Sequence, residues 1–132
     1  MTIQELEKII RKSWSKRIDN GPSELLKDGD ISAGQCAVTA LVVQDYLGGE
    51  ILNTIATDPQ YPDVSSSHYF NIINNEVVDL TKRQFKDTVQ FSEPSPKTKG
   101  FDSTRDYMLS FPSTVVRYQT LKSNVEKLLS TQ

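Results

Sequence analysis

The segment from residue 36 to residue 47, CAVTALVVQDYL, constrains the fold of this chain more than any other. As a helix, it is apolar around nearly its whole circumference. Such a helix is stable only when it is buried on all sides within a domain. Gly48 and Gly49 follow it directly and end it. We therefore expect a central buried helix with the rest of the chain packed around it.

Two amphipathic helices are predicted near the ends of the chain, one over residues 2–14 and one from Ser113 onward. Charged residues separate their apolar positions, so each helix has one apolar face. Both helices can cover the central helix, and we expect a monomer or weak dimer. The apolar positions are Ile3, Leu6, Ile10 and Trp14 in the first helix, and Tyr118, Leu121, Val125 and Leu128 in the last.

The middle of the chain has the pattern of a small antiparallel sheet. The segment Glu50–Ala56 is short and contains several β-branched residues, which predicts a strand. The polar segment 57–67 predicts an exposed loop. Residues His68–Ile73 and Glu76–Leu80 flank Asn74-Asn75, two residues that tolerate positive φ, which predicts a hairpin. With helices before and after these strands, the α+β class is favoured.

The remaining segments predict short elements and loops. We expect a turn or short helix within Asp19–Gly34, a capped short helix from Thr81 that carries Phe85 inward, a strand at Val89–Phe91, a surface loop at Ser92–Gly100 and a short helix at Asp102–Leu109.

Length and charge exclude several classes of protein. A chain of 132 residues fits one domain, 1–132. The net charge of -2 gives no field that would attract nucleic acid or an anionic membrane, so neither is an expected partner. The longest apolar run, Ala37–Val43, is far shorter than the roughly 20 residues that cross a bilayer. The first residues lack the pattern of a signal peptide, and we expect a cytoplasmic protein.

The chain contains one cysteine, Cys36, and one histidine, His68. A single cysteine excludes a disulfide within the chain and suits a reducing compartment. A zinc site would need carboxylates to complete its ligands. We therefore expect no metal site and no cofactor.

Cys36 is a candidate nucleophile because it begins the buried helix after the flexible residues Ala33-Gly34-Gln35. The positive end of the helix dipole favours a thiolate and an oxyanion formed during acyl transfer. The alternative is a structural cysteine, since free cysteines are often buried. Gln35 is a candidate oxyanion donor, although an exposed polar residue before a helix is equally compatible with the sequence.

His68 and Asp79 are predicted to be neighbours across the hairpin. With Asn74-Asn75 as the turn, Phe70 faces Asp79 and His68 faces Thr81, so His68 and Asp79 lie diagonally on one face. A carboxylate within the apolar run VVDL needs a partner if it is buried. A lone strand histidine with a structural role is the alternative. Asn71 is the rival third residue, but strand alternation sends it to the other face.

Three segments carry a family resemblance: GQCAVTALVVQDYLGGEI, HYFN and VVDLTKRQF. They closely resemble the small bacterial YunG-type proteins over about residues 34–85. More distantly, the order Cys, His, Asp is similar to the papain-like and transglutaminase-like thiol enzymes. That resemblance implies a central helix packed on a small antiparallel sheet. It departs from papain at Asp30, which occupies the place of the papain glutamine six residues before the nucleophile.

These observations lead to two hypotheses of function. In the first, the protein is a cysteine hydrolase or acyltransferase of peptidase, amidase or deamidase type. Cys36 attacks a peptide, amide or other acyl substrate to form a thioester, His68 moves the proton and Asp79 orients the imidazole. In the second, the fold is catalytically silent and binds a small ligand or a protein. Segments 58–67 and 92–100 are candidate walls of the binding site.

Overall fold

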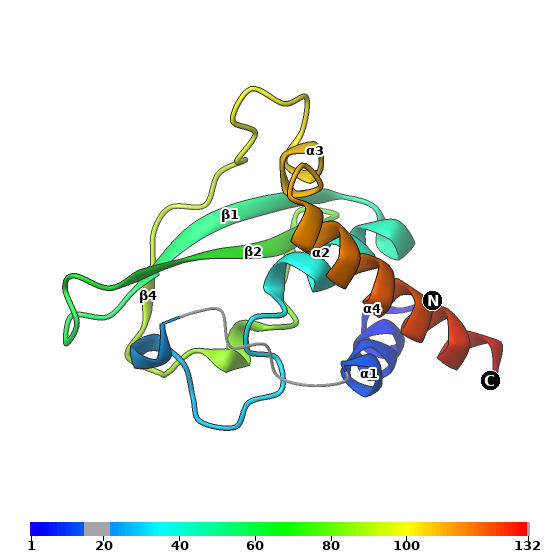
Figure 1. Cartoon of the computed structure of the whole chain (residues 1–132), viewed down its shortest axis with the longest axis horizontal. Coiled ribbons are helices and arrows are strands. Elements are labelled where there is room, and N and C mark those ends of the chain that lie inside the picture. The colour runs from blue at the N-terminus through cyan, green and yellow to red at the C-terminus, as the bar shows by residue number, and fades with distance from the viewer. Residues whose placement is uncertain (15–21, 132) are drawn as a thin grey trace.

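The computed structural model describes residues 1–14 and 22–131, and its elements form an α+β fold (Figure 1). The four strands make one antiparallel sheet in the order β3-β2-β1-β4. The elements in chain order are α1 Ile3–Ser13, the 3₁₀ turn η1 Ser23–Leu25, α2 Cys36–Leu47, β1 Glu50–Thr57, β2 Ser65–Ile73, β3 Glu76–Val78, the 3₁₀ turn η2 Lys82–Gln84, β4 Gln90–Phe91, α3 Thr104–Met108 and α4 Pro112–Ser130.

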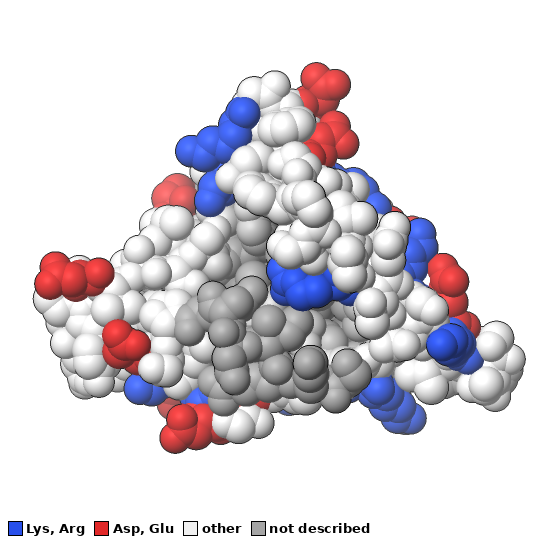
Figure 2. Space-filling model, viewed as in Figure 1, with Lys and Arg blue, Asp and Glu red and all other residues white. Residues whose placement is uncertain are grey.

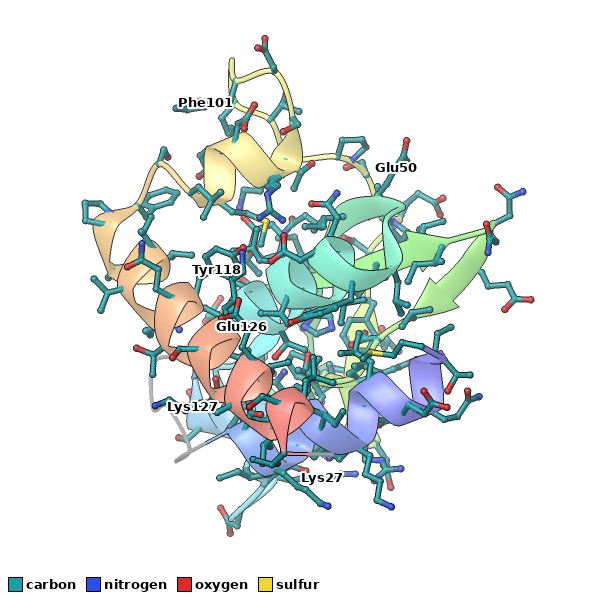
Figure 3. The ribbon with its side chains drawn as sticks, turned by 90° about the vertical axis from the view of Figure 1, so that its right-hand side faces the viewer. Lys27, Glu50, Phe101, Tyr118, Glu126 and Lys127 are labelled. Carbon is teal, nitrogen blue, oxygen red and sulfur yellow. The ribbon has the colours of Figure 1, made fainter. Side chains whose placement is uncertain are left out.

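Helix α2 lies at the centre of the molecule, as its apolar sequence predicts. Every residue from Val38 to Val43 is buried. One side of the helix packs on β2, where the Asn71 side chain donates a hydrogen bond to the Ala40 carbonyl oxygen at 3.0 Å. Helices α4 and α1 cover other sides, and Figure 3 shows α2 beside α4 and above α1. The predicted central helix is confirmed with its expected bounds.

The two amphipathic helices bury the faces that their spacing predicts. In α1, Leu6 and Ile10 are fully buried, and the Trp14 indole that follows donates a hydrogen bond to Thr39 of α2 at 3.1 Å. In α4, Tyr118 points toward α2, and Leu121 and Val125 are buried beside it (Figure 3). Apolar burial of this kind supplies most of the stability of such helices.

The predicted hairpin forms, but its second strand is shorter than expected. Asn74 and Asn75 both have positive φ, 52° and 65°, as the tight turn requires. Ile73 pairs with Glu76 as predicted, and the ladder ends at the pair Asn71–Val78. The expected ladder pairs of Phe70 with Asp79 and of His68 with Thr81 are therefore wrong, because the chain leaves the sheet after Val78.

Some predicted boundaries also change. Strand β2 begins at Ser65, because Ser65–Ser67 continue the ladder with the end of β1, and the loop predicted over 57–67 is correspondingly shorter. Thr81 precedes a 3₁₀ turn without a side-chain cap, and Phe85 is buried after it as predicted. Within Asp19–Gly34 the structure contains η1, and residues 19–21 lie outside the described part. No helix in the ranges 1–14 and 22–131 is long and apolar enough to cross a membrane.

Candidate active site

Cys36 is the first residue of α2 and is half-buried at the edge of a cavity of about 450 Å³. The preceding residue, Gln35, provides no side-chain cap for the helix. In the part of the chain that the structure describes, no residue accepts a hydrogen bond from the backbone N–H of Cys36 or Ala37. Unpaired donors at a helix N-terminus favour negative charge, so the thiol lies where a thiolate is stabilised.

The side chain of His68 is almost completely buried, with 1% of its surface exposed. The Phe85 ring meets the imidazole edge-on with the ring centroids 4.9 Å apart, and Phe70 and Phe91 pack near it. These three aromatic rings come from β2, from the segment after η2 and from β4. They exclude water from the imidazole and fix its position.

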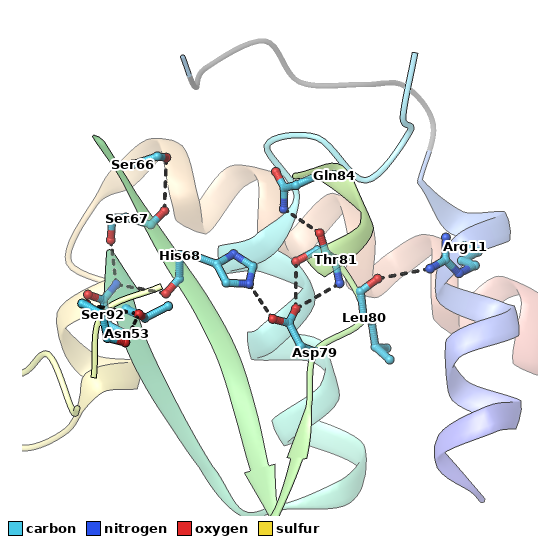
Figure 4. A network of polar contacts seen from close by, with 11 residues as sticks. Arg11, Asn53, Ser66, Ser67, His68, Asp79, Leu80, Thr81, Gln84 and Ser92 are labelled. Atoms are coloured by element: carbon cyan, nitrogen blue, oxygen red, sulfur yellow. Dashed lines mark hydrogen bonds and ion pairs between the residues drawn. The ribbon is translucent and has the colours of Figure 1, made fainter. Parts of the chain in front are cut away.

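Asp79 is the hydrogen-bond partner of His68. The His68 Nε2 atom lies 2.7 Å from the Asp79 Oδ2 atom (Figure 4). The other carboxylate oxygen accepts a hydrogen bond from the backbone N–H of Thr81 at 3.3 Å. Asp79 follows the last residue of β3, so the end of the ladder lets its side chain turn toward the imidazole. The diagonal arrangement inferred from the hairpin therefore brings the two side chains together although their ladder positions differ.

The other ring nitrogen of His68, Nδ1, is buried and has no hydrogen-bond partner of ordinary geometry among the described residues. Because Nε2 is engaged by Asp79, Nδ1 is the nitrogen left for the Cys36 thiol, which interacts with this ring. The contact is looser than a formed hydrogen bond, as is common in unliganded thiol sites. The backbone N–H of Tyr69 also interacts with the Cys36 sulfur.

The charges at the site favour an ion pair. Burial raises the pKa of the Cys36 thiol, but interaction with the His68 imidazolium outweighs it, and the pKa lies below its usual value. Burial lowers the pKa of His68, but Asp79 and Cys36 outweigh that effect and raise the pKa of His68 to about 9. Both shifts favour a thiolate beside an imidazolium.

The structure places the other sequence candidates as follows. Gln35 is buried and is not among the described residues that line the cavity at Cys36. The Asn71 side chain lies on the face of β2 toward α2, where it donates a hydrogen bond to the Ala40 carbonyl oxygen, and not beside His68 and Asp79. The Asp30 carboxylate accepts hydrogen bonds from the backbone and side chain of Ser32. Asp79 is the carboxylate whose charge opposes the Cys36 thiolate and raises the pKa of that thiol.

Comparison with known proteins shows the family. Residues 2–130 match the family described as YunG protein. The chain belongs to the YunG family. It is 32% identical over 105 residues, 79% of this chain and 82% of the relative, to a Bacillus subtilis (strain 168) protein named Uncharacterized protein YunG. No solved structure matches the chain. The resemblance read from residues 34–85 is thus confirmed for the YunG family, and it extends over nearly the whole chain.

The cavity of this YunG family member contains residues that the sequence did not single out. Ser65, Ser66, Ser67 and Lys97 come from the two segments predicted as walls, whereas α3 and α4 contribute Tyr107 and Arg117. Gln84 fixes the position of the segment that precedes Cys36, because its Oε1 accepts a hydrogen bond from the Gly34 N–H at 3.1 Å. No periodicity marks these residues, since they meet only through the fold. In the described ranges, no group of three or more His, Cys, Asp or Glu residues is placed to hold a metal ion.

Proposed function

We propose that this YunG family member is a thiol enzyme that acts on the carbonyl group of an acyl or amide substrate. The observation that carries the proposal is the position of His68, whose Nε2 is held by Asp79 while its ring interacts with the Cys36 thiol. The aromatic rings around His68 make the imidazole rigid and dry. An activated nucleophile with an oriented base is the arrangement that acyl transfer uses.

In the proposed reaction, the Cys36 thiolate attacks the carbonyl carbon and forms a tetrahedral oxyanion. The His68 imidazolium then gives its Nδ1 proton to the leaving amine or alkoxide as the bond to that group breaks. A thioester remains on Cys36. Water or an amine, deprotonated by neutral His68, attacks the thioester and releases the acyl group. Asp79 keeps the Nε2 proton in place and stabilises the imidazolium.

The start of α2 supplies candidate donors to the oxyanion. The backbone N–H of Cys36 points from an uncapped helix end, and the helix dipole adds to its effect. Gln35 stays a proposed second donor. Its buried position means that its amide would have to turn toward the cavity when substrate binds.

The edge of β2 beside Cys36 suits an amide-containing substrate. The backbone N–H and C=O groups of Asn53 in β1 form hydrogen bonds with Ser95 and therefore point away from β2. Tyr69 is the residue of β2 opposite Asn53 in the ladder. The backbone groups of Tyr69 therefore point away from β1, toward the open edge of β2. Ser65 and Ser67 share that direction, and β3 ends before it reaches them. Both serines line the cavity. In the described chain no strand pairs with this edge, which leaves room for hydrogen bonds to a substrate amide.

The arrangement supports a papain-like or transglutaminase-like architecture as part of the proposal. Cysteine at the start of a central helix, histidine on a strand and aspartate after the next strand occur here in that chain order. Asp30 in place of the papain glutamine means that the second oxyanion donor would differ from papain.

The pH dependence of Cys36 alkylation by iodoacetamide tests this function. We expect the reaction to titrate well below the unperturbed thiol pKa of about 8.5, because the imidazolium stabilises the thiolate. In a His68→Gln variant the apparent pKa should rise, and Cys36→Ala gives the background. A wild-type profile at or above pH 8.5 would contradict the enzyme and favour a silent binding domain.

A further inference from the structure

Two basic side chains line the cavity, and each contacts a residue that is close in sequence to His68 or to Cys36. The Lys97 Nζ atom lies 3.4 Å from the Oγ atom of Ser67, the residue that precedes His68 in the sequence. The Arg117 Nη1 atom donates a hydrogen bond to the Gly34 carbonyl oxygen at 3.3 Å, two residues before Cys36. Both cations therefore line the cavity that contains Cys36, Lys97 beside Ser67 of β2 and Arg117 beside the segment that leads into α2.

Within residues 1–14 and 22–131, neither cation is neutralised by a carboxylate. Among the described residues, no carboxylate forms an ion pair with Lys97 or Arg117, and none of those lining the cavity is acidic. Most donors of both groups stay available, since the Arg117 guanidinium has five N–H bonds and the Lys97 ammonium three. Figure 2 shows that the acidic side chains visible on one face lie mainly near its outline, whereas basic side chains also lie nearer the middle.

The remaining walls are largely aromatic and polar. Tyr69, Tyr107 and Phe111 border the cavity, and the Tyr107 and Phe111 rings meet edge-on with centroids 5.2 Å apart. Lys97 lies over the Tyr107 ring, with Nζ 5.9 Å from its centroid. A volume of about 450 Å³ is within the range of pockets for small molecules.

From these features we infer that the substrate is a small acyl compound with a negatively charged group, a carboxylate or a phosphate, held by Lys97 and Arg117. The inference rests on the proposed function, since it assigns the substrate class of the same site. The charged group would be bound by the cations while its reactive carbonyl lies at Cys36. The arginine suits bidentate binding of an oxyanion, and the lysine adds a second positive charge.

The charge of the alkylating reagent provides a probe that needs no knowledge of the substrate. Iodoacetate and iodoacetamide differ mainly by the negative carboxylate. We expect the ratio of their rates with Cys36 to exceed the ratio measured with glutathione. In Lys97→Gln and in Arg117→Gln the ratio should fall roughly two- to fivefold, the effect of one unit charge at close range in a partly solvated site. It should also fall in 1 M salt.

Matched variants separate charge from structure. Lys97→Arg and Arg117→Lys keep the positive charge and should keep a raised ratio, and Lys127→Gln, at an exposed position near the far end of α4, should leave it unchanged. The His68 imidazolium attracts iodoacetate in all of these variants, so the difference between them reports the two cations alone. A ratio that stays at the wild-type value in both Lys97→Gln and Arg117→Gln would overturn the inference.

The two proposals fail in different ways. If Cys36 titrates with iodoacetamide as an ordinary thiol, the enzyme proposal fails, and the ratio measured above pH 9 still decides whether the cavity attracts anions. If Cys36 has a low pKa but the ratio does not depend on Lys97 or Arg117, the anionic substrate is wrong and the enzyme proposal stands.

Discussion

The His68 Nε2 atom and the Asp79 Oδ2 atom lie 2.7 Å apart in a part of the molecule from which the rings of Phe85 and Phe91 exclude water. A buried imidazole gains a proton only when a negative partner offsets the loss of solvation. The hydrogen bond therefore fixes both the orientation and the charge of the ring, and the state of the Cys36 thiol depends on it.

Replacing Asp79 with Asn should lower the pKa of His68. Without the carboxylate, burial of the imidazole is no longer offset, and the His68 pKa of about 9 should fall by roughly one to two units. Cys36 should become about tenfold less reactive toward iodoacetamide at pH 7, because less imidazolium is present. NMR titration gives the pKa directly, since His68 is the chain's single histidine. Asp87→Asn, at a fully exposed carboxylate, is the control, and a His68 pKa equal to that of wild type would refute the prediction.

The free energy of unfolding should depend on pH through His68. Its pKa is about 9 in the folded protein against 6.5 unfolded, so its contribution is fully present below pH 6.5 and is lost as the pH rises through 9. Urea unfolding of wild type and Asp79→Asn should therefore differ more at pH 6 than at pH 10, by on the order of 2 kcal/mol. A difference that grows with pH would have the opposite sign and contradict the charged imidazole.

Gly49 should tolerate alanine much less well than Gly48. Both glycines have positive φ, 79° and 71°, so alanine is strained at either position. At Gly49 an added Cβ would also lie 2.2 Å from the Ile72 carbonyl oxygen, whereas at Gly48 it meets nothing within 4 Å. We expect Gly48→Ala to cost about 1 kcal/mol of the free energy of unfolding and Gly49→Ala at least about 2 kcal/mol more. Equal costs in urea unfolding would show that Ile72 moves away freely.

Arg105 should contribute to stability without affecting the thiol. From α3 it donates hydrogen bonds to the Leu41 carbonyl oxygen at 3.2 Å, to Asp45 of α2 at 2.8 Å and to the Tyr118 hydroxyl of α4 at 2.9 Å. Arg105→Ala should lower the free energy of unfolding by about 1–3 kcal/mol, because these acceptors lose a charged donor. The alkylation profile of Cys36 should stay that of wild type. Lys127→Ala, on the exposed face of α4, should change the free energy of unfolding by no more than about 0.5 kcal/mol. It should also leave the alkylation profile of Cys36 unchanged.

The sequence by itself determined the helices and the hairpin turn. Helix α2 has the bounds that its apolar run predicts, and α1 and α4 bury most of the residues spaced at three and four positions, with Ile3 and Leu128 partly buried. Asn74 and Asn75 adopt the backbone that a two-residue turn needs. These features depend on residues a few positions apart, so local periodicity and turn chemistry are sufficient to predict them.

The tertiary structure alone decided how the candidate site is built. The hairpin predicted that His68 and Asp79 are neighbours, but the ladder between β2 and β3 ends at Val78, so only the structure shows that Asp79 makes this contact from just beyond the strand. Lys97 and Arg117 meet at one cavity although twenty positions separate them, and Gln84 reaches Gly34 from fifty positions away. Burial, exclusion of water and the balance of charge depend on which distant segments pack together, and no local pattern in the sequence encodes that.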